Sequence, residues 1–114
     1  MILLNQVRQP RSFNCMISEI ECVISGRVQM VMFRDFAKRT ADKLGLTGFV
    51  ENLSDGTVHL VAQGEREMLT RYIDQYLKSG PTFAKVASVR VEWKTPVESY
   101  PDFRIRFSGF FDRL

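Results

Sequence analysis

The stretch that decides the fold is EIECVISGRVQMVMFRDFAKRTADKLG, residues 19–45, because its hydrophobic period changes partway along. From Glu19 to Ser25 apolar and polar residues alternate, which predicts a half-buried strand. From Phe33 the apolar residues recur at helical spacing, and Gly45 is a residue typical of a helix C-terminus. A strand that leads through a short loop into an amphipathic helix therefore opens the domain.

The rest of the chain continues this succession of strands and helices. Residues 47–64 are typical of two strands joined at Asp55-Gly56, a pair that tolerates the positive φ of a tight hairpin turn. A second amphipathic helix is predicted over residues 65–79, and alternating runs predict two more strands around residues 88–93 and 103–107. The order β-α-β-β-α-β with an extra C-terminal strand predicts an α+β, ferredoxin-like sandwich. Its two helices are expected on one face of a four- or five-stranded, mostly antiparallel sheet.

The same patterns separate one domain from two flanking segments. We expect the domain to span residues 19–107, with an N-terminal extension (1–18) before it and an aromatic tail (108–114) after it. Phe110 and Phe111 of the tail are expected to pack locally onto the domain, with a dimer contact as the alternative. The apolar side chains predicted to face the core are Ile20, Cys22, Ile24, Phe33, Phe36, Ala37, Ala41, Leu44, Val58, Leu60, Ala62, Met68, Leu69, Tyr72, Ile73, Tyr76, Leu77, Val89, Val91, Trp93, Phe103, Ile105 and Phe107.

Composition and charge limit the classes of function. The 114 residues are 45% hydrophobic and 25% charged, which is ordinary for one folded domain. The formal net charge of +3 attracts anions mildly and is too small to indicate nucleic acid. An RNA-binding module of this fold would also need an aromatic-rich RNP1 sequence, which is missing. Because no apolar run has the length of a signal peptide or a membrane span, we expect a cytoplasmic monomer without nucleic-acid or membrane partners.

The cysteines and the histidine disfavour metal and triad chemistry. Cys15 and Cys22 have no CxxC spacing and are predicted to be free thiols in a reducing compartment. His59 is the only histidine, so a multi-histidine metal site or a histidine-based triad would lack partners. Its place in the alternation predicts an outward-facing strand residue, and we assign it no role.

The segment between the first strand and the first helix, GRVQMVMFR at residues 26–34, is the candidate for chemistry. No Ser, Thr, Asp or Asn stands where the helix should be capped, so its first backbone N–H groups lack a side-chain acceptor. Arg34 also adds positive charge to the first turn, where the helix dipole disfavours a cation. A bound anion would explain both features, since N–H groups at a helix start and a guanidinium form a phosphate site. The alternative is that water satisfies the N–H groups and Arg34 is a solvated surface residue.

Two motifs together resemble the signature of the acylphosphatase family. GRVQMVMFR (26–34) is similar to the family's GRVQGVGFR, and GFVENLSDGTV (48–58) follows its G-x-V-x-N-x-x-D-G-x-V pattern at the right separation. AQG before the second helix and FRIRF at residues 103–107 also fit, so the resemblance covers residues 19–107. It implies hydrolysis of small acyl phosphates to a carboxylate and inorganic phosphate, with no metal, cofactor or covalent intermediate.

The resemblance also implies residue roles. Arg34 matches the family's phosphate-binding arginine, and Asn52 matches the asparagine that positions the attacking water. The loop residues that would supply backbone N–H donors to the substrate are Val28, Gln29, Met30, Val31, Met32 and Phe33. Because an acyl phosphate has a good leaving group, an arginine and an amide that hold phosphate and water are sufficient. Without the family, Asn52 would be interpreted as an ordinary turn asparagine.

Two loop positions depart from the family pattern. Met30 stands where the family has Gly, and Met32 stands where it often has Gly or an aromatic residue. If the backbone at Met30 needs positive φ, a residue with a Cβ costs roughly 1–2 kcal/mol, and its thioether would crowd the entrance to the site. The expected function is acyl phosphate hydrolysis; the alternative is a weak or inactive domain of this fold that binds an anion or a protein partner.

Overall fold

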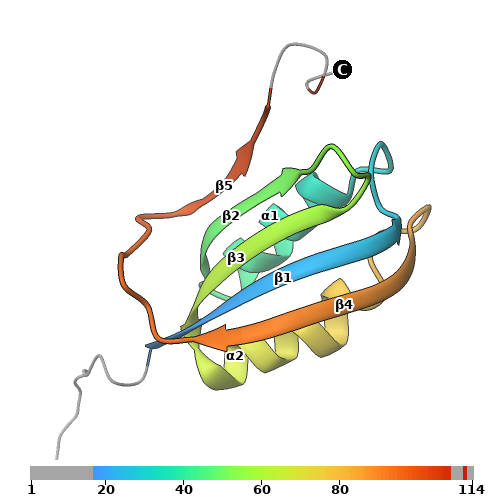
Figure 1. The fold of residues 1–114 in the computed structure, drawn as a ribbon. Helices are drawn as coiled ribbons and strands as arrows, with labels where there is room; N and C mark the ends of the chain where they lie inside the picture. Colours follow the sequence, from blue (N-terminus) through green and yellow to red (C-terminus); the bar gives the residue numbers. More distant parts are fainter. Residues whose placement is uncertain (1–16, 109–111, 113–114) are drawn as a thin grey trace, which may run out of the picture.

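The computed structural model, which describes residues 17–108 and residue 112, confirms the ferredoxin-like α+β fold (Figure 1). The elements in chain order are β1 (Ile17–Arg27), α1 (Phe33–Lys43), β2 (Thr47–Asn52), β3 (Val58–Glu65), α2 (Arg66–Arg71), η2 (Tyr72–Leu77), β4 (Lys85–Lys94) and β5 (Phe103–Arg106). The sheet has five strands in the order β4-β1-β3-β2-β5, and the helices cover one of its faces. All neighbouring strands are antiparallel except β2 and β5, which are parallel.

The pairing register places two connections and the end of β5 at the same end of the sheet. Ile24 near the end of β1 pairs with Val58 at the start of β3, and Val58 also pairs with Asn52 at the end of β2. Glu51 of β2 pairs with Arg106 of β5, and the two strands are parallel, so β5 also ends at this end of the sheet. The β1–α1 loop, the β2–β3 hairpin and the C-terminal end of β5 therefore lie at the same end of the sheet (Figure 1).

The hydrophobic core lies between the sheet and the helices, as the alternation predicts. Its members are Ile20, Cys22, Ile24, Val28, Phe33, Ala37, Ala41, Leu46, Val50, Val58, Leu60, Ala62, Leu69, Tyr72, Ile73, Leu77 and Phe103. Val89, Val91 and Trp93 are partly buried against it, and Phe107, which we expected in the core, is 39% exposed just beyond β5. The Phe107 side chain lies at the end of the sheet where the β1–α1 loop and the β2–β3 hairpin meet.

The second helix occupies the predicted region but changes its form halfway. The α-helical part, α2, gives way to the π-helical η2, and the N–H of Lys78 donates to the Ile73 oxygen five residues earlier at 3.1 Å. The Tyr72 hydroxyl, fully buried, donates to the Ala37 oxygen of α1 at 2.7 Å. The wider turn keeps Tyr72, Ile73 and Leu77 together on the buried face.

A glycine opens each of the two motifs because strands approach closely there. A Cβ on Gly26 would lie 2.2 Å from the Lys85 oxygen, and a Cβ on Gly48 would lie 1.9 Å from the Val61 oxygen. Both residues also have positive φ, of 118° and 142°. Any larger residue would push neighbouring strands apart.

Several sequence expectations concern positions that the structure describes only in part. Cys22 is a buried free thiol, whereas Cys15 lies outside the described residues, as do Phe110 and Phe111 of the tail. The first strand begins at Ile17, inside the expected N-terminal extension. Among the helices described, none is long and apolar enough to cross a membrane.

Candidate active site

The loop between β1 and α1 has an unusual backbone. Met30 and Met32 both have positive φ, 62° and 66°, and they are the two non-glycine residues with this property in the described chain. Met32 is the residue that precedes α1, and it makes no side-chain capping hydrogen bond. The positive φ considered for Met30 is therefore present, and a second one follows two residues later. Left-handed backbone at residues with a Cβ is strained and is concentrated at functional sites.

This conformation leaves a row of unpaired donors at the start of the helix. Within residues 17–108 and 112, the backbone N–H groups of residues 30–34 have no protein acceptor. The first intrahelical bond at this end is the one that the Phe36 N–H donates to the Met32 oxygen, at 3.0 Å. N–H groups at a helix start carry partial positive charge, so they favour an anion.

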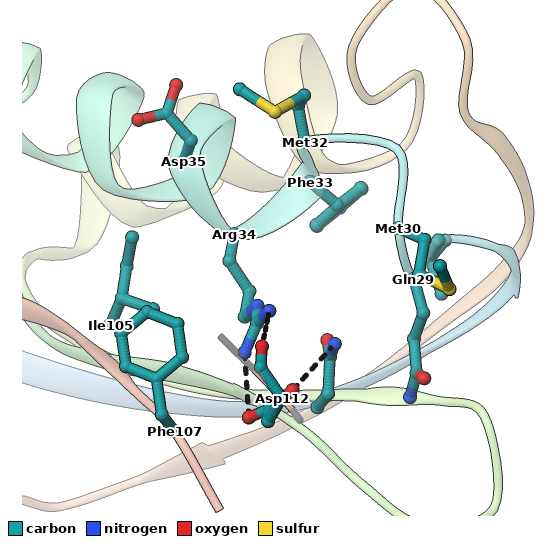
Figure 2. A pocket seen from close by; sticks show the side chains of 11 residues that line it. Gln29, Met30, Met32, Phe33, Arg34, Asp35, Ile105, Phe107 and Asp112 are labelled. Carbon is teal, nitrogen blue, oxygen red and sulfur yellow. Dashed lines mark hydrogen bonds and ion pairs between the residues drawn. The ribbon is translucent and has the colours of Figure 1, made fainter. Parts of the chain in front are cut away.

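Arg34 lies in the first turn of α1 and extends across the end of the sheet (Figure 2). Its Nη1 donates to Oδ2 of Asp112 at 2.9 Å and its Nη2 donates to the backbone oxygen of Asp112 at 3.0 Å. Its guanidinium carbon lies 4.8 Å from the centre of the Phe107 ring. The side chains of Arg34 and Asp112 are only 18% and 13% exposed, so Arg34 is not the solvated surface residue considered as the alternative.

Asn52, the last residue of β2, contacts the same carboxylate. Its Nδ2 is 3.5 Å from Oδ1 of Asp112, a long hydrogen bond. Its Oδ1 is buried and has no hydrogen-bond partner among the described residues. A buried acceptor of this kind is normally satisfied by an ordered water. Arg34 and Asn52, which are 18 positions apart in the sequence, thus converge on one carboxylate.

Gln29 connects the loop to the hairpin that carries Asn52. Its Nε2 donates to the backbone oxygens of Leu53 and Thr57, both at 2.8 Å. These two bonds use both N–H groups of the side-chain amide. Gln29 therefore fixes the distance between the two halves of the site, and its side chain has no donor left for a ligand.

These residues surround a cavity of about 640 Å³. The residues that line it are Val28, Gln29, Met30, Met32, Phe33, Arg34, Asp35, Asn52, Ile105, Phe107 and Asp112. Of the predicted site residues, Val31 is the one whose side chain does not line the cavity, because it packs against the core. Val28 and Phe33 are 1% exposed, so those two contribute mainly backbone to the site. Met30 is 95% exposed at the rim.

A second acidic residue, Asp35, lines the cavity, but its carboxylate is not directed toward Arg34. The carboxylate accepts a hydrogen bond from Arg39 Nε at 2.8 Å on the outer face of α1. In Figure 2 this side chain points away from Arg34. The charged groups that face each other inside the cavity are therefore Arg34 and Asp112.

Asp112 is the functional residue that sequence reasoning missed. It lies in the tail interpreted as aromatic, and it is the only acidic residue of positions 108–114. The N–H of Ser108 donates to its Oδ2 at 2.9 Å. This bond, together with the charge of Arg34 and the hydrogen bonds from Arg34 and Asn52, holds the pKa of Asp112 below its usual range. The one feature of the sequence that could have indicated Asp112 was Arg34, a cation in the first turn of a helix without an apparent acidic partner.

His59 lies away from the cavity, on the sheet face opposite the helices. Its Nδ1 is 2.7 Å from Oε2 of Glu51, and its Nε2 is 2.7 Å from Oε2 of Glu21. In the part of the chain that is described, no group of three or more His, Cys, Asp or Glu side chains is arranged to hold a metal ion. These contacts are structural cross-strand pairs.

Comparison with known proteins agrees with both motifs. The acylphosphatase family model matches residues 20–105. An acylphosphatase of Dehalococcoides mccartyi is 41% identical over 88 residues, which are 76% of this chain and 96% of that protein. An acylphosphatase of Coxiella burnetii is 45% identical over 87 residues, which are 76% of this chain and 90% of that protein.

Solved structures give the same result. The structure of an acylphosphatase from Coxiella burnetii superimposes with a TM-score of 0.75 at 42% identity, covering 82% of this chain and 96% of that one. The crystal structure of acylphosphatase from Bacillus subtilis gives a TM-score of 0.76 at 33% identity, covering 79% of this chain and 99% of that one. The likeness thus extends over nearly the whole of both solved chains.

Proposed function

Because the chain belongs to the acylphosphatase family and hydrolyses acyl phosphates, we propose that the reaction takes place in the cavity between the β1–α1 loop and Asn52. Arg34 and the N–H groups of residues 30–34 bind the phosphoryl group. Asn52 holds the attacking water. The observation that carries this assignment is that Arg34 and Asn52 both bind one anionic group, the Asp112 carboxylate.

Phosphoryl binding follows from the donors at this end of α1. The guanidinium of Arg34 offers two parallel N–H groups that fit two phosphoryl oxygens. The N–H groups of the loop lie at the start of α1, beside the same cavity, and add the positive end of the helix dipole. Donors held rigidly in a partly buried site stabilise the charge that spreads over the phosphoryl oxygens in the transition state.

Water positioning is the role that suits Asn52. Its buried Oδ1 accepts a hydrogen bond from the water, which turns the water oxygen toward phosphorus. As the water oxygen bonds to phosphorus, the bond between phosphorus and the acyl oxygen breaks and the carboxylate leaves with the electron pair. The proton released by the water passes to the phosphate product. No strong base is needed, because a carboxylate is a good leaving group.

Steady-state hydrolysis of benzoyl phosphate tests this assignment. We expect turnover by the wild type, and a loss of about 100-fold or more in kcat/KM for both Arg34→Ala and Asn52→Ala. Lys38→Ala is the control, since Lys38 lies on the same helix and pairs with Asp42, and neither residue lines the cavity. A wild type no faster than buffer, with phosphate still protecting it in a thermal melt, would identify an anion-binding domain without turnover.

We also propose that the protein works as a monomer in the cytoplasm without nucleic acid. The catalytic groups all come from one chain, the net charge is only +3, and Cys22 is a free thiol. Light scattering on the eluting protein is expected to give the mass of one 13.2 kDa chain. A dimer mass at micromolar concentration would contradict the monomer.

A further inference from the structure

Asp112 uses the donors that the substrate needs. Both Nη atoms of Arg34 are bonded to it, and Nδ2 of Asn52 is 3.5 Å from its carboxylate. The carboxylate is further fixed by the N–H of Ser108, at 2.9 Å. Figure 2 shows Asp112 at the end of the Arg34 side chain, with Phe107 beside it. An acidic side chain thus stands where the catalytic arginine and asparagine meet.

The chemistry of this contact resembles that of the substrate. A carboxylate and a phosphoryl group are both anions with oxygen acceptors, and both fit the fork of a guanidinium. Arg34 and Asp112 are 78 positions apart and largely shielded from water, so their ion pair is little screened. An acyl phosphate bound to the same Nη atoms has to displace Asp112 first.

We propose that Asp112 is an intramolecular competitive inhibitor, a carboxylate that occupies the phosphoryl position of the free enzyme and is exchanged for substrate at each turnover. This proposal rests on the assignment of Arg34 and Asn52 to the reaction. Asp112 lies beyond the region that matches the family model, residues 20–105.

Competition and positioning predict different kinetics. If the closed state predominates, the apparent affinity for substrate and phosphate is reduced by the fraction of molecules that are open. Removing the carboxylate then lowers KM and the Kd of phosphate together and leaves kcat unchanged. A residue that merely holds Arg34 in its active orientation would, when removed, lower kcat.

The experiment compares Asp112→Asn and Asp112→Ala with the wild type. We expect both variants to lower the KM for benzoyl phosphate about tenfold, and to lower by the same factor the Kd of inorganic phosphate measured by calorimetry. Asp102→Asn is the matched control, because Asp102 is an exposed acid that pairs with Arg104 outside the cavity. It removes the same charge and is expected to leave both constants unchanged.

Three results would overturn the competitive role. A lower kcat with unchanged phosphate affinity would make Asp112 a positioning residue. Unchanged KM and Kd in both Asp112 variants would show that the carboxylate does not compete. An equal gain in the Asp102→Asn control would attribute the effect to net charge alone. Failure of the catalytic assignment is distinguishable, because Arg34→Ala would then keep full activity whatever the Asp112 variants do.

Discussion

The side chain of Gln29 in the β1–α1 loop donates a hydrogen bond to the backbone oxygen of Leu53 in the β2–β3 hairpin, at 2.8 Å. This bond, with its companion to Thr57, joins the phosphate-binding half of the site to the half that carries Asn52. Neither the loop nor the hairpin alone determines the shape of the cavity. The site is therefore sensitive to changes at a residue that does not contact substrate through its side chain.

Gln29→Ala tests this link. The variant loses two hydrogen bonds to carbonyl oxygens that each keep one backbone donor, so we expect the free energy of unfolding to fall by about 1–3 kcal/mol. We also expect kcat/KM for benzoyl phosphate to fall, because Asn52 is no longer held against the loop. Chemical denaturation and steady-state kinetics measure the two effects. Gln75→Ala, at an exposed position of η2, is the control and should change neither.

Met30 allows backbone strain to be separated from side-chain bulk. Met30→Gly and Met30→Ala both remove the thioether, but only Gly removes the Cβ that φ of 62° disfavours. We expect the Gly variant to be more stable than the Ala variant by about 1 kcal/mol, after the larger chain entropy of Gly is subtracted. Denaturant midpoints at equal m-values give the comparison. An Ala variant as stable as the Gly variant would show that the strain is relieved elsewhere.

The same substitution also bears on the entrance to the cavity. Met30 is 95% exposed and lines the cavity, so Met30→Gly is expected to raise kcat/KM by a factor of up to about ten. Met30→Ala should give a similar gain if access is what limits the wild type. A rate unchanged in both variants would mean that the methionine is accommodated without obstruction.

Cys22 should be inert in the folded protein. Burial raises the pKa of its thiol to about 12, and its side chain is completely shielded from solvent. In a Cys15→Ser background we expect no reaction with a thiol reagent at pH 8, and complete reaction once the chain is unfolded in guanidinium. Native labelling at the rate of a free thiol would contradict the buried position. Cys15 itself, in a Cys22→Ser variant, serves as the comparison.

The cross-strand pairs of Glu21 predict a pH-dependent contribution to stability. Hydrogen bonds from Lys94 and then His59 lower the pKa of Glu21 from its ordinary value of 4.5. The stabilisation is therefore present above about pH 4.5 and is lost as the pH falls through the lower pKa of the folded state. Glu21→Gln should reduce stability at neutral pH by no more than about 1 kcal/mol, and the difference should shrink in acid.

Thermal melts from pH 7 to pH 3 measure this difference. Glu67→Gln is the control, because Glu67 is 81% exposed and lies 4.0 Å from Arg71. It should change the melting temperature little at any pH. A gap between Glu21→Gln and the wild type that stays constant down to pH 3 would contradict the linkage.

The sequence by itself determined the elements that depend on local periodicity and turn chemistry. The alternation from Glu19, the helical spacing from Phe33 and the Asp55-Gly56 turn each correspond to an observed element. The positive φ considered at Met30 is also present. Such features are set by neighbours within a few positions along the chain. The pairing of Arg34 with Asn52 came instead from the resemblance of the two motifs to the acylphosphatase family.

The tertiary structure alone decided the contacts between distant segments. Nothing in the spacing of apolar residues shows that Asp112 meets Arg34, that Gln29 spans to the hairpin, or that Val31 turns into the core. The π-helical form of residues 72–77, in which the Tyr72 hydroxyl bonds to α1, is likewise not visible in the apolar spacing. Periodicity predicts which face of an element is buried. The contacts between distant segments depend instead on which strand ends the sheet topology brings to the same end of the sheet.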